Sequence, residues 1–325
     1  MRSSISKIVL SLLAAGFMSG AIAQQKVELK VSEIWGEDYP NTKALRSMSE
    51  NLAKRSNGRI DLKVYPNGTL GTEKEVIEQV KLGALAMARV PLNLMNNICE
   101  ETLVPSLPFL FRSTDHLHKA LDSAAGQEIL SSCNAKGYIG LAYYDSGTRS
   151  IYAKKAIKTL ADTKGLKLRV QQSDLMVAMA QAMGANPSPM PMGEVYVGLR
   201  TGLIDAAENN WPSYESSKHF ESAKFYSRTE HLMNPEIVIF SKVIWDKLSP
   251  ADQKLIADAA KESTTVQRKL WAEREKVSEG IVRKAGSTIV EVDKKPFQDA
   301  MVPVYAKFIT TPHMKDLVKR IQDVK

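Results

Sequence analysis

The chain has 325 residues, with 44 Lys and Arg against 36 Asp and Glu, which gives a formal net charge of +8. A basic balance can indicate nucleic-acid binding, but here the basic residues are dispersed among acidic ones and form no basic block or aromatic-basic array. The composition therefore argues against a nucleic-acid partner. It favours a solvated surface that mildly attracts anionic ligands.

The N-terminus has the pattern of a secretory signal peptide. Arg2 and Lys7 precede an apolar run from Ile8 to Phe17, and small residues follow up to Ala21-Ile22-Ala23, an Ala-x-Ala cleavage site. The apolar run is about half the roughly 20 residues that a membrane-spanning helix needs. We therefore expect residues 1–23 to be removed and a soluble, exported chain, long enough for about two domains, to begin near Gln24.

Apolar periodicity alternates between strand-like and helix-like segments, which is typical of an α/β fold. The first half predicts strands over 27–33, 60–65, 87–90 and 138–144. Its predicted helices begin at Thr42, at the capping box Thr72-x-x-Glu75 and at about Thr114, the last continuing to Asn134, and a packed loop with two prolines covers 104–111.

The second half repeats this alternation. The pattern predicts strands over 166–170, 204–208, 224–229 and 236–241, with helices over 173–183 and 193–201 and a proline-rich connection between them. The chain therefore reads as two consecutive α/β halves.

One long helix is predicted near the C-terminal end. Ser249 fits its N-cap, Pro250 its first position, and the sequence stays compatible with a helix up to Gly286. At 1.5 Å per residue such a helix would be about 54 Å long, well beyond the roughly 30 Å width of a small domain. It would therefore run across both halves, unless a bend at Ser263-Thr264-Thr265 divides it into two.

Familiar catalytic and metal-binding patterns are missing from the sequence. It contains no Gly-x-Ser-x-Gly, no glycine-rich phosphate loop and no Cys-x-x-Cys. His116 and His118 lie two residues apart at a predicted helix start and point to different sides, so we expect no metal site and no cofactor. An exported protein permits a disulfide between Cys99 and Cys133, but the spacing alone does not decide whether it forms.

Charged and amide residues gather where the predicted strands end. These residues are Glu33, Arg89, Arg149, which follows the strand ending at Tyr144, Arg169 and Asn209-Asn210. Open α/β sheets bind their ligands at the carboxyl ends of strands, so this set predicts a binding cleft.

Arg169 is the most informative member of that set because it lies inside the apolar strand Leu166 to Val170. Burying a guanidinium is costly unless it is paired, and its planar fork matches a carboxylate in bidentate geometry. Arg169 is therefore predicted to bind a ligand carboxylate. The alternative is an internal ion pair with Asp or Glu, an alternative that carries more weight for Arg89 and Arg149.

Several ordered motifs resemble one known family over essentially the whole mature chain. The motifs are Leu70-Gly71-Thr72-Glu73-Lys74-Glu75, Leu107-Pro108-Phe109-Leu110-Phe111, Asp145-Ser146-Gly147-Thr148-Arg149, Gly165-Leu166-Lys167-Leu168-Arg169-Val170-Gln171, Glu194-Val195-Tyr196 and the stretch Ile204 to Pro212. They resemble the substrate-binding proteins of tripartite ATP-independent periplasmic (TRAP) transporters, and most closely the subgroup that binds glucuronate and galacturonate.

The resemblance implies roles for individual residues. The Arg at Arg169 would form the salt bridge to the ligand carboxylate, with Asn209 bonding the same end and Arg149 assisting. Glu73 would bond ligand hydroxyls, while Glu33 and Arg89 would face the cleft from the first lobe. Trp35, Tyr214 and Asn210 complete the expected binding residues. Relatives often carry His at the position of Trp35, a departure that concerns the far end of the ligand.

The resemblance also implies a two-lobed periplasmic binding protein of the Venus-flytrap type, with the long helix crossing both lobes. Residues 24–148 with about 236–270 would form lobe I, and residues 149–235 with about 271–325 lobe II. We expect a monomer that closes by hinge motion on a small anionic solute and delivers it to membrane permease subunits.

Three alternatives stay open at this point. The ligand could be another organic acid, such as an aldonate, a keto acid or a dicarboxylate. The protein could be a periplasmic sugar-acid enzyme that uses Glu33 and Glu73 as paired carboxylates, or it could feed a sensor rather than a permease.

Overall fold

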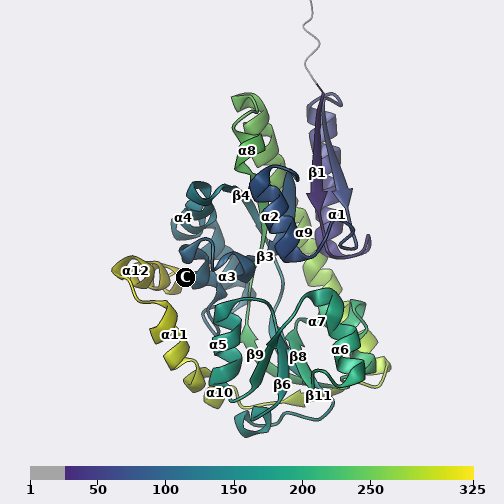
Figure 1. Cartoon of the computed structure of the whole chain (residues 1–325), viewed down its shortest axis with the longest axis vertical. Helices are drawn as coiled ribbons and strands as arrows, with labels where there is room; N and C mark the ends of the chain where they lie inside the picture. The colour runs from purple at the N-terminus through teal and green to yellow at the C-terminus, as the bar shows by residue number, and fades with distance from the viewer. Residues whose placement is uncertain (1–25) are drawn as a thin grey trace, which may run out of the picture.

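A computed structural model describes residues 26–325, which form two lobes, each built on its own β-sheet (Figure 1). The expected signal peptide, residues 1–23, lies outside the described residues. Within residues 26–325, no helix combines the length and the apolar character needed to cross a membrane.

The first lobe contains a five-stranded sheet in the order β2-β1-β3-β10-β4. Strands β1 to β3 run parallel, whereas β10 runs antiparallel to both β3 and β4. The strands are β1 Val27–Ser32, β2 Ile60–Tyr65, β3 Met87–Pro91, β4 Tyr138–Tyr144 and β10 Glu236–Ser241. The helices of this lobe are α1 Pro40–Arg55, α2 Glu73–Leu82, α3 Thr114–Asp122, α4 Ala124–Ser132 and α8 Lys242–Trp245.

The second lobe contains a six-stranded sheet in the order β11-β9-β5-β8-β6-β7. Its strands are β5 Arg149–Ala153, β6 Lys167–Val170, β7 Asn186–Pro189, β8 Ala206–Asn209, β9 Phe225–Leu232 and β11 Thr288–Glu291. Its helices are α5 Asp174–Ala182, α6 Val195–Thr201 and α7 Trp211–Ser216. The chain thus enters this sheet after β4 and returns to the first sheet at β10.

The predicted long helix is one continuous element, α9, over Pro250–Lys284. The Ser249 side chain accepts a hydrogen bond from the Asp252 backbone N–H, as expected of an N-cap. Its first half packs on α1 and β4 and buries Ile256 in the core of the first lobe, while its second half contacts α7 and buries Val282 in the core of the second. The helix therefore joins the two lobes along one side (Figure 1).

Three short helices end the chain: α10 Lys295–Ala300, α11 Val302–Phe308 and α12 Pro312–Gln322. They climb along the side of the molecule from the second lobe, where α11 packs on α5, to the first, where α12 packs on α4 (Figure 1). The Arg112 guanidinium donates hydrogen bonds to the carbonyls of Gln322 and Val324, which fastens the C-terminus there. The expected assignment of residues 271–325 to lobe II stays a prediction, and α12 contacts the other lobe.

The helix predicted over 114–134 is two helices in the structure. Ser123 has an extended backbone (ψ 169°), and its hydroxyl accepts a hydrogen bond from the Gly126 backbone N–H, so α4 starts anew after it. A side chain at Gly126 would place its Cβ 2.2 Å from the carbonyl oxygen of Leu121, so glycine is required for this close turn. The prediction of one helix was wrong because the apolar periodicity continues without interruption across Ser123.

Three strands of the second sheet, β5, β7 and β11, were not predicted. β5 begins at Arg149, so this residue lies in a strand rather than in the loop after β4. β7 contains Pro187 and Pro189 and forms the edge of the sheet beside β6. An edge strand tolerates proline because one side of its backbone needs no ladder hydrogen bonds.

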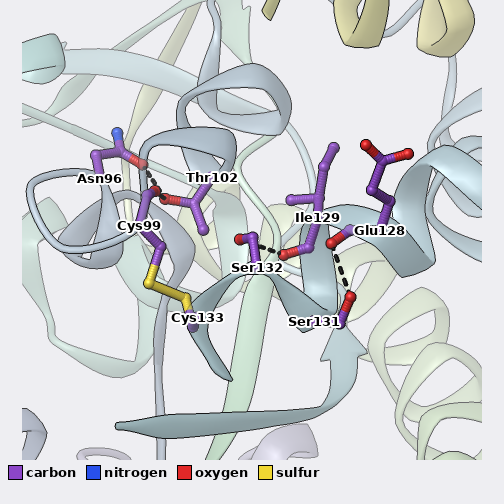
Figure 2. The surroundings of a disulfide bond; sticks show 8 residues. All are labelled: Asn96, Cys99, Thr102, Glu128, Ile129, Ser131, Ser132 and Cys133. Carbon is purple, nitrogen blue, oxygen red and sulfur yellow. Dashed lines mark hydrogen bonds between the residues drawn. A yellow bond between two sulfur atoms is a disulfide. The ribbon is translucent and has the colours of Figure 1, made fainter. Parts of the chain in front are cut away.

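Cys99 and Cys133 form a disulfide, with their Cα atoms 5.3 Å apart. Figure 2 shows how it fastens the end of α4 to the segment before the 3₁₀ helix Glu100–Ser106, where Thr102 hydrogen-bonds Asn96 and the Cys99 carbonyl. Both cysteines are fully buried. The disulfide therefore braces the helical layer of the first lobe.

Candidate solute-binding crevice

A polar crevice lies between the two lobes, at the edge where the parallel strands of both sheets end. It is lined from the first lobe by Trp35, Glu73, Arg89, Pro91 and Glu236, and from the second by Arg149, Arg169, Gln171, Met192, Asn209 and Ser213. Strand ends of two sheets thus supply one site, as expected for open α/β sheets.

Arg89 is held by two carboxylates of its own lobe. Its Nε donates to Glu33 Oε2 at 2.8 Å, its Nη2 to the other oxygen of Glu33, and its Nη1 to Glu236. All three side chains are at least nine-tenths buried. For Arg89 the structure therefore shows the internal ion pair, although the guanidinium still lines the crevice.

Arg149 is likewise paired within its lobe. Its Nε and Nη2 bond the two carboxylate oxygens of Glu208 at 2.7 and 2.8 Å, and its Nη1 donates to Asn209 Oδ1 at 2.8 Å. Burial alone would raise the pKa of Glu208, but the charge of Arg149, its hydrogen bonds and the neighbouring His231 together outweigh burial and lower that pKa to about 2. Glu208 is therefore a permanent anion that neutralises Arg149.

Arg169 differs from both. It is 2% exposed, and within residues 26–325 no carboxylate lies within 4.0 Å of its guanidinium. Its Nε and Nη2 each donate to the carbonyl of Met190, at 3.0 and 2.7 Å, which leaves three of its five N–H hydrogens without an acceptor in this part of the chain. Burial lowers its pKa, which is the signature of a charge without sufficient compensation.

Glu73 and Asn209 supply polar groups beside Arg169. Burial raises the pKa of Glu73 to about 7, against the opposing influence of Arg89. Asn209 Oδ1 accepts hydrogen bonds from Arg149 and from the Asn210 backbone N–H, whereas its Nδ2 has, among residues 26–325, only the sulfur of Met192 as a partner, at 3.8 Å. Asn209 is thus oriented as a hydrogen-bond donor, while Glu73 can change its protonation near neutral pH.

Three of the expected binding residues do not line the crevice. Both carboxylate oxygens of Glu33 already accept hydrogen bonds, from the Arg89 guanidinium and from the Trp35 backbone N–H. Asn210 caps α7 by accepting from the Ser213 backbone N–H, and its amide donates to the Ser146 carbonyl. Tyr214 is fully buried and donates to the Ala223 carbonyl. The polar groups of these three residues form hydrogen bonds within the fold, so their predicted contact with a ligand stays a prediction.

Several lining residues escaped the sequence pattern. Gln171 and Ser213 carry no charge, and Met192 lies in the proline-rich connection. Glu236 begins β10, which pairs antiparallel with β3 so that Glu236 lies opposite Pro91. The first residue of an antiparallel strand therefore reaches the same edge as the last residues of parallel strands, and only knowledge of strand direction would have placed it there.

Hydrogen bonds across the crevice hold the lobes together. Tyr39 Oη lies 3.0 Å from Ser213 Oγ, and the Asn93 amide donates to Gln171 Oε1 at 2.7 Å. The free volume of the crevice is about 10 Å³, close to the space for one water molecule. The lobes therefore have to separate to admit a solute, which is the motion of a hinged binding protein.

Comparison with known proteins identifies the family. Residues 31–311 match the model of bacterial extracellular solute-binding protein, family 7 (DctP). The chain belongs to this family. Its members serve TRAP transporters together with membrane permease subunits, so the two lobes, the shared long helix and the crevice are those of a TRAP solute-binding protein.

For three similar proteins, the solute that each one binds is known. A TRAP periplasmic solute-binding protein from a Bradyrhizobium species, solved with α/β-D-galacturonate, is 54% identical, with a TM-score of 0.90 over 91% of this chain and 99% of that one. One from Pseudomonas putida F1, solved with D-glucuronate, is 42% identical, with a TM-score of 0.90 over 92% and 98% of the two chains. The 2,3-diketo-L-gulonate-binding periplasmic protein YiaO of Escherichia coli is 36% identical over 87% of each chain.

Proposed function

We propose that the protein captures a uronate, D-glucuronate or D-galacturonate, in the periplasm and delivers it to the membrane subunits of a TRAP transporter. The observation that carries the proposal is Arg169, a buried guanidinium without a carboxylate partner in residues 26–325. A solute carboxylate would satisfy its remaining N–H groups in bidentate geometry.

The other groups of the crevice suit the remainder of a uronate. Asn209 offers a second donor beside Arg169, while Glu73 and Glu236 offer carboxyl oxygens to ligand hydroxyls from the opposite lobe. Two charge-assisted hydrogen bonds contribute about 3–6 kcal/mol, whereas micromolar affinity needs about 8 kcal/mol. Contacts to hydroxyls and to the ring must therefore supply the difference.

Three independent features support a periplasmic location of the protein. The N-terminal pattern predicts a signal peptide, the family is extracellular, and Cys99 and Cys133 are paired, as an oxidising compartment permits.

A binding role fits the crevice better than an enzymatic one. The enzyme alternative required Glu33 and Glu73 as paired carboxylates, yet Glu33 is bonded to Arg89 and stands outside the crevice lining. A hydrolase would also need a position for a water or nucleophile next to the scissile bond. We therefore propose that the solute leaves unchanged.

A thermal-shift screen followed by calorimetric titration tests the proposal. The ligands are D-glucuronate, D-galacturonate, D-gluconate, 2,3-diketo-L-gulonate and succinate. Both uronates should raise the melting temperature and bind at micromolar or lower concentration. Mass spectrometry of the incubated uronate should show no product. Stabilisation by succinate or diketogulonate, with no response to either uronate, would overturn the ligand assignment.

A further inference from the structure

Trp35 is held in a fixed orientation at the edge of the crevice. Its indole stacks on the Tyr39 ring with centroids 4.4 Å apart and planes 12° apart. Tyr39 is itself fixed, because its hydroxyl bonds Ser213 of the other lobe and its ring meets Trp271 edge-on at 5.8 Å. The Trp35 backbone N–H donates to Glu33 Oε1 at 3.0 Å. One indole face is therefore covered by Tyr39.

Trp35 and Met192 together separate the crevice from the solvent side. Both line the crevice, and both also line a groove of about 460 Å³ that opens outside it, between the segment Ile34–Tyr39 and the start of α6. Trp35 comes from the first lobe and packs against the apolar cluster of the second lobe that contains Met192. The pair therefore forms the wall across which the two lobes meet.

This wall is the apolar part of a crevice that is otherwise charged or polar. Besides Trp35 and Met192, Pro91 is the apolar member of the lining, and the other lining residues carry carboxylate, guanidinium, amide or hydroxyl groups. The Met192 sulfur lies 3.8 Å from Asn209 Nδ2, so the apolar wall begins next to the groups that we assign to the solute carboxylate.

The chemistry of the wall distinguishes a ring from a chain. A pyranose chair gathers axial C–H groups on one face, and that face can lie flat on an aromatic ring and a thioether with its hydroxyls directed to the rim. An open-chain polyhydroxy acid turns hydroxyls to every side. Placing it against the same wall would bury hydroxyls without hydrogen-bond partners, which costs free energy.

We propose that Trp35 and Met192 form an apolar clamp over the sugar ring, and that this clamp selects a cyclic uronate over the open-chain acid of the same carbon skeleton. The inference rests on the proposed function, since it assumes that a sugar acid occupies the crevice. It assigns ring selectivity to Trp35 and Met192 and carboxylate binding to Arg169, two independent roles within one site.

The experiment compares two ligands that differ by the reduction of one carbon. D-glucuronate forms a pyranose, whereas L-gulonate, its product of reduction at C1, keeps the carboxylate and the hydroxyl configuration but has no carbonyl with which to close that ring. Calorimetric titration at neutral pH gives a dissociation constant for each. The wild-type protein should bind D-glucuronate about tenfold to hundredfold more tightly than L-gulonate.

Variants at the wall test the assignment. Trp35→Leu should weaken D-glucuronate binding and bring the two dissociation constants to within about threefold of each other. Met192→Gln, of similar size but polar, should lower the ratio of the dissociation constant for L-gulonate to that for D-glucuronate. Trp245→Leu is the matched control, because Trp245 is also a half-buried tryptophan of the first lobe but lies outside the crevice lining, packed on Phe240. Its ratio should equal that of the wild type.

The outcomes separate the two proposals. Equal affinity of the wild-type protein for both ligands, or an unchanged ratio in both Trp35→Leu and Met192→Gln, would overturn the clamp and leave the proposed function standing. Failure of the wild-type protein to bind any uronate would overturn the proposed function itself. Thermal unfolding of each variant identifies one that has lost its fold, and the ratio in the other variant then decides.

Discussion

Replacing Arg169 by Met separates a ligand-binding charge from a structural one. Three N–H hydrogens of Arg169 have no acceptor in residues 26–325, and a bound carboxylate would accept two of them. At about 1.5–3 kcal/mol for each charge-assisted bond, the variant should lose about 3–6 kcal/mol of binding free energy. That corresponds to a factor of about 10² to 10⁴ in the dissociation constant.

The fold should be affected little by this change. Arg169→Met leaves the Met190 carbonyl without its two donors but also removes a buried, uncompensated charge, so we expect the stability of the free protein to change by no more than about 1–2 kcal/mol. Arg89→Met is the matched comparison, because it leaves the buried carboxylates of Glu33 and Glu236 without their cationic partner. This change should lower the free energy of unfolding by about 3–5 kcal/mol.

Calorimetry with D-glucuronate and urea unfolding of the ligand-free protein measure these two effects. Binding by Arg169→Met within tenfold of the wild type would refute the carboxylate assignment. Equal destabilisation by Arg169→Met and Arg89→Met would refute the distinction between an unpaired and a paired guanidinium.

Three further outcomes follow from the structure. Replacing Cys99 and Cys133 together by Ser opens a loop with a sequence separation of 34 and should lower the free energy of unfolding by about 4 kcal/mol in urea; an unchanged midpoint would contradict this. Because Glu73 has a pKa of about 7, it is mostly protonated at pH 6 and ionised at pH 8, where it repels an anionic solute. Uronate affinity, measured by calorimetric titration, should therefore fall by up to about tenfold in total as the pH rises from 6 to 8, and Glu73→Gln should remove this dependence. Tyr39→Phe removes the hydroxyl contact with Ser213, worth about 0.5–1.5 kcal/mol, and should increase the radius of gyration of the ligand-free protein in X-ray scattering; identical scattering curves would show that the contact does not hold the lobes.

Periodicity and capping residues predicted most of the regular elements because those signals are local. Ser249 and Pro250 marked the start of α9, and the capping box Thr72-x-x-Glu75 marked that of α2, both confirmed by hydrogen bonds in the structure. The break at Ser123 was missed because a cap inside a continuous apolar pattern resembles an ordinary helical serine. Strand β7 was missed because its prolines are tolerated only at a sheet edge, a property of the tertiary structure.

The candidate site was predicted less completely, for a different reason. The sequence showed that Arg89, Arg149 and Arg169 lie at strand ends, but not which of them already have a carboxylate partner. The partner Glu236 is 147 residues away from Arg89 and reaches it only because β10 runs antiparallel to β3. Pairing between distant strands thus separates Arg169, which we propose binds the ligand, from the two arginines that are paired within the fold.

The continuous helix α9 is packed into both lobes, so a bend of this helix changes the orientation of one lobe relative to the other. Because 35 residues extend about 52 Å, a bend of about 10° at the middle displaces one end by about 4–5 Å relative to the axis of the other half. A ring inserted between two packed surfaces needs about 3.5–4 Å of extra separation, the thickness of one more van der Waals layer. A small flexure of α9 that breaks no hydrogen bond of the helix would therefore supply the separation that one sugar ring needs.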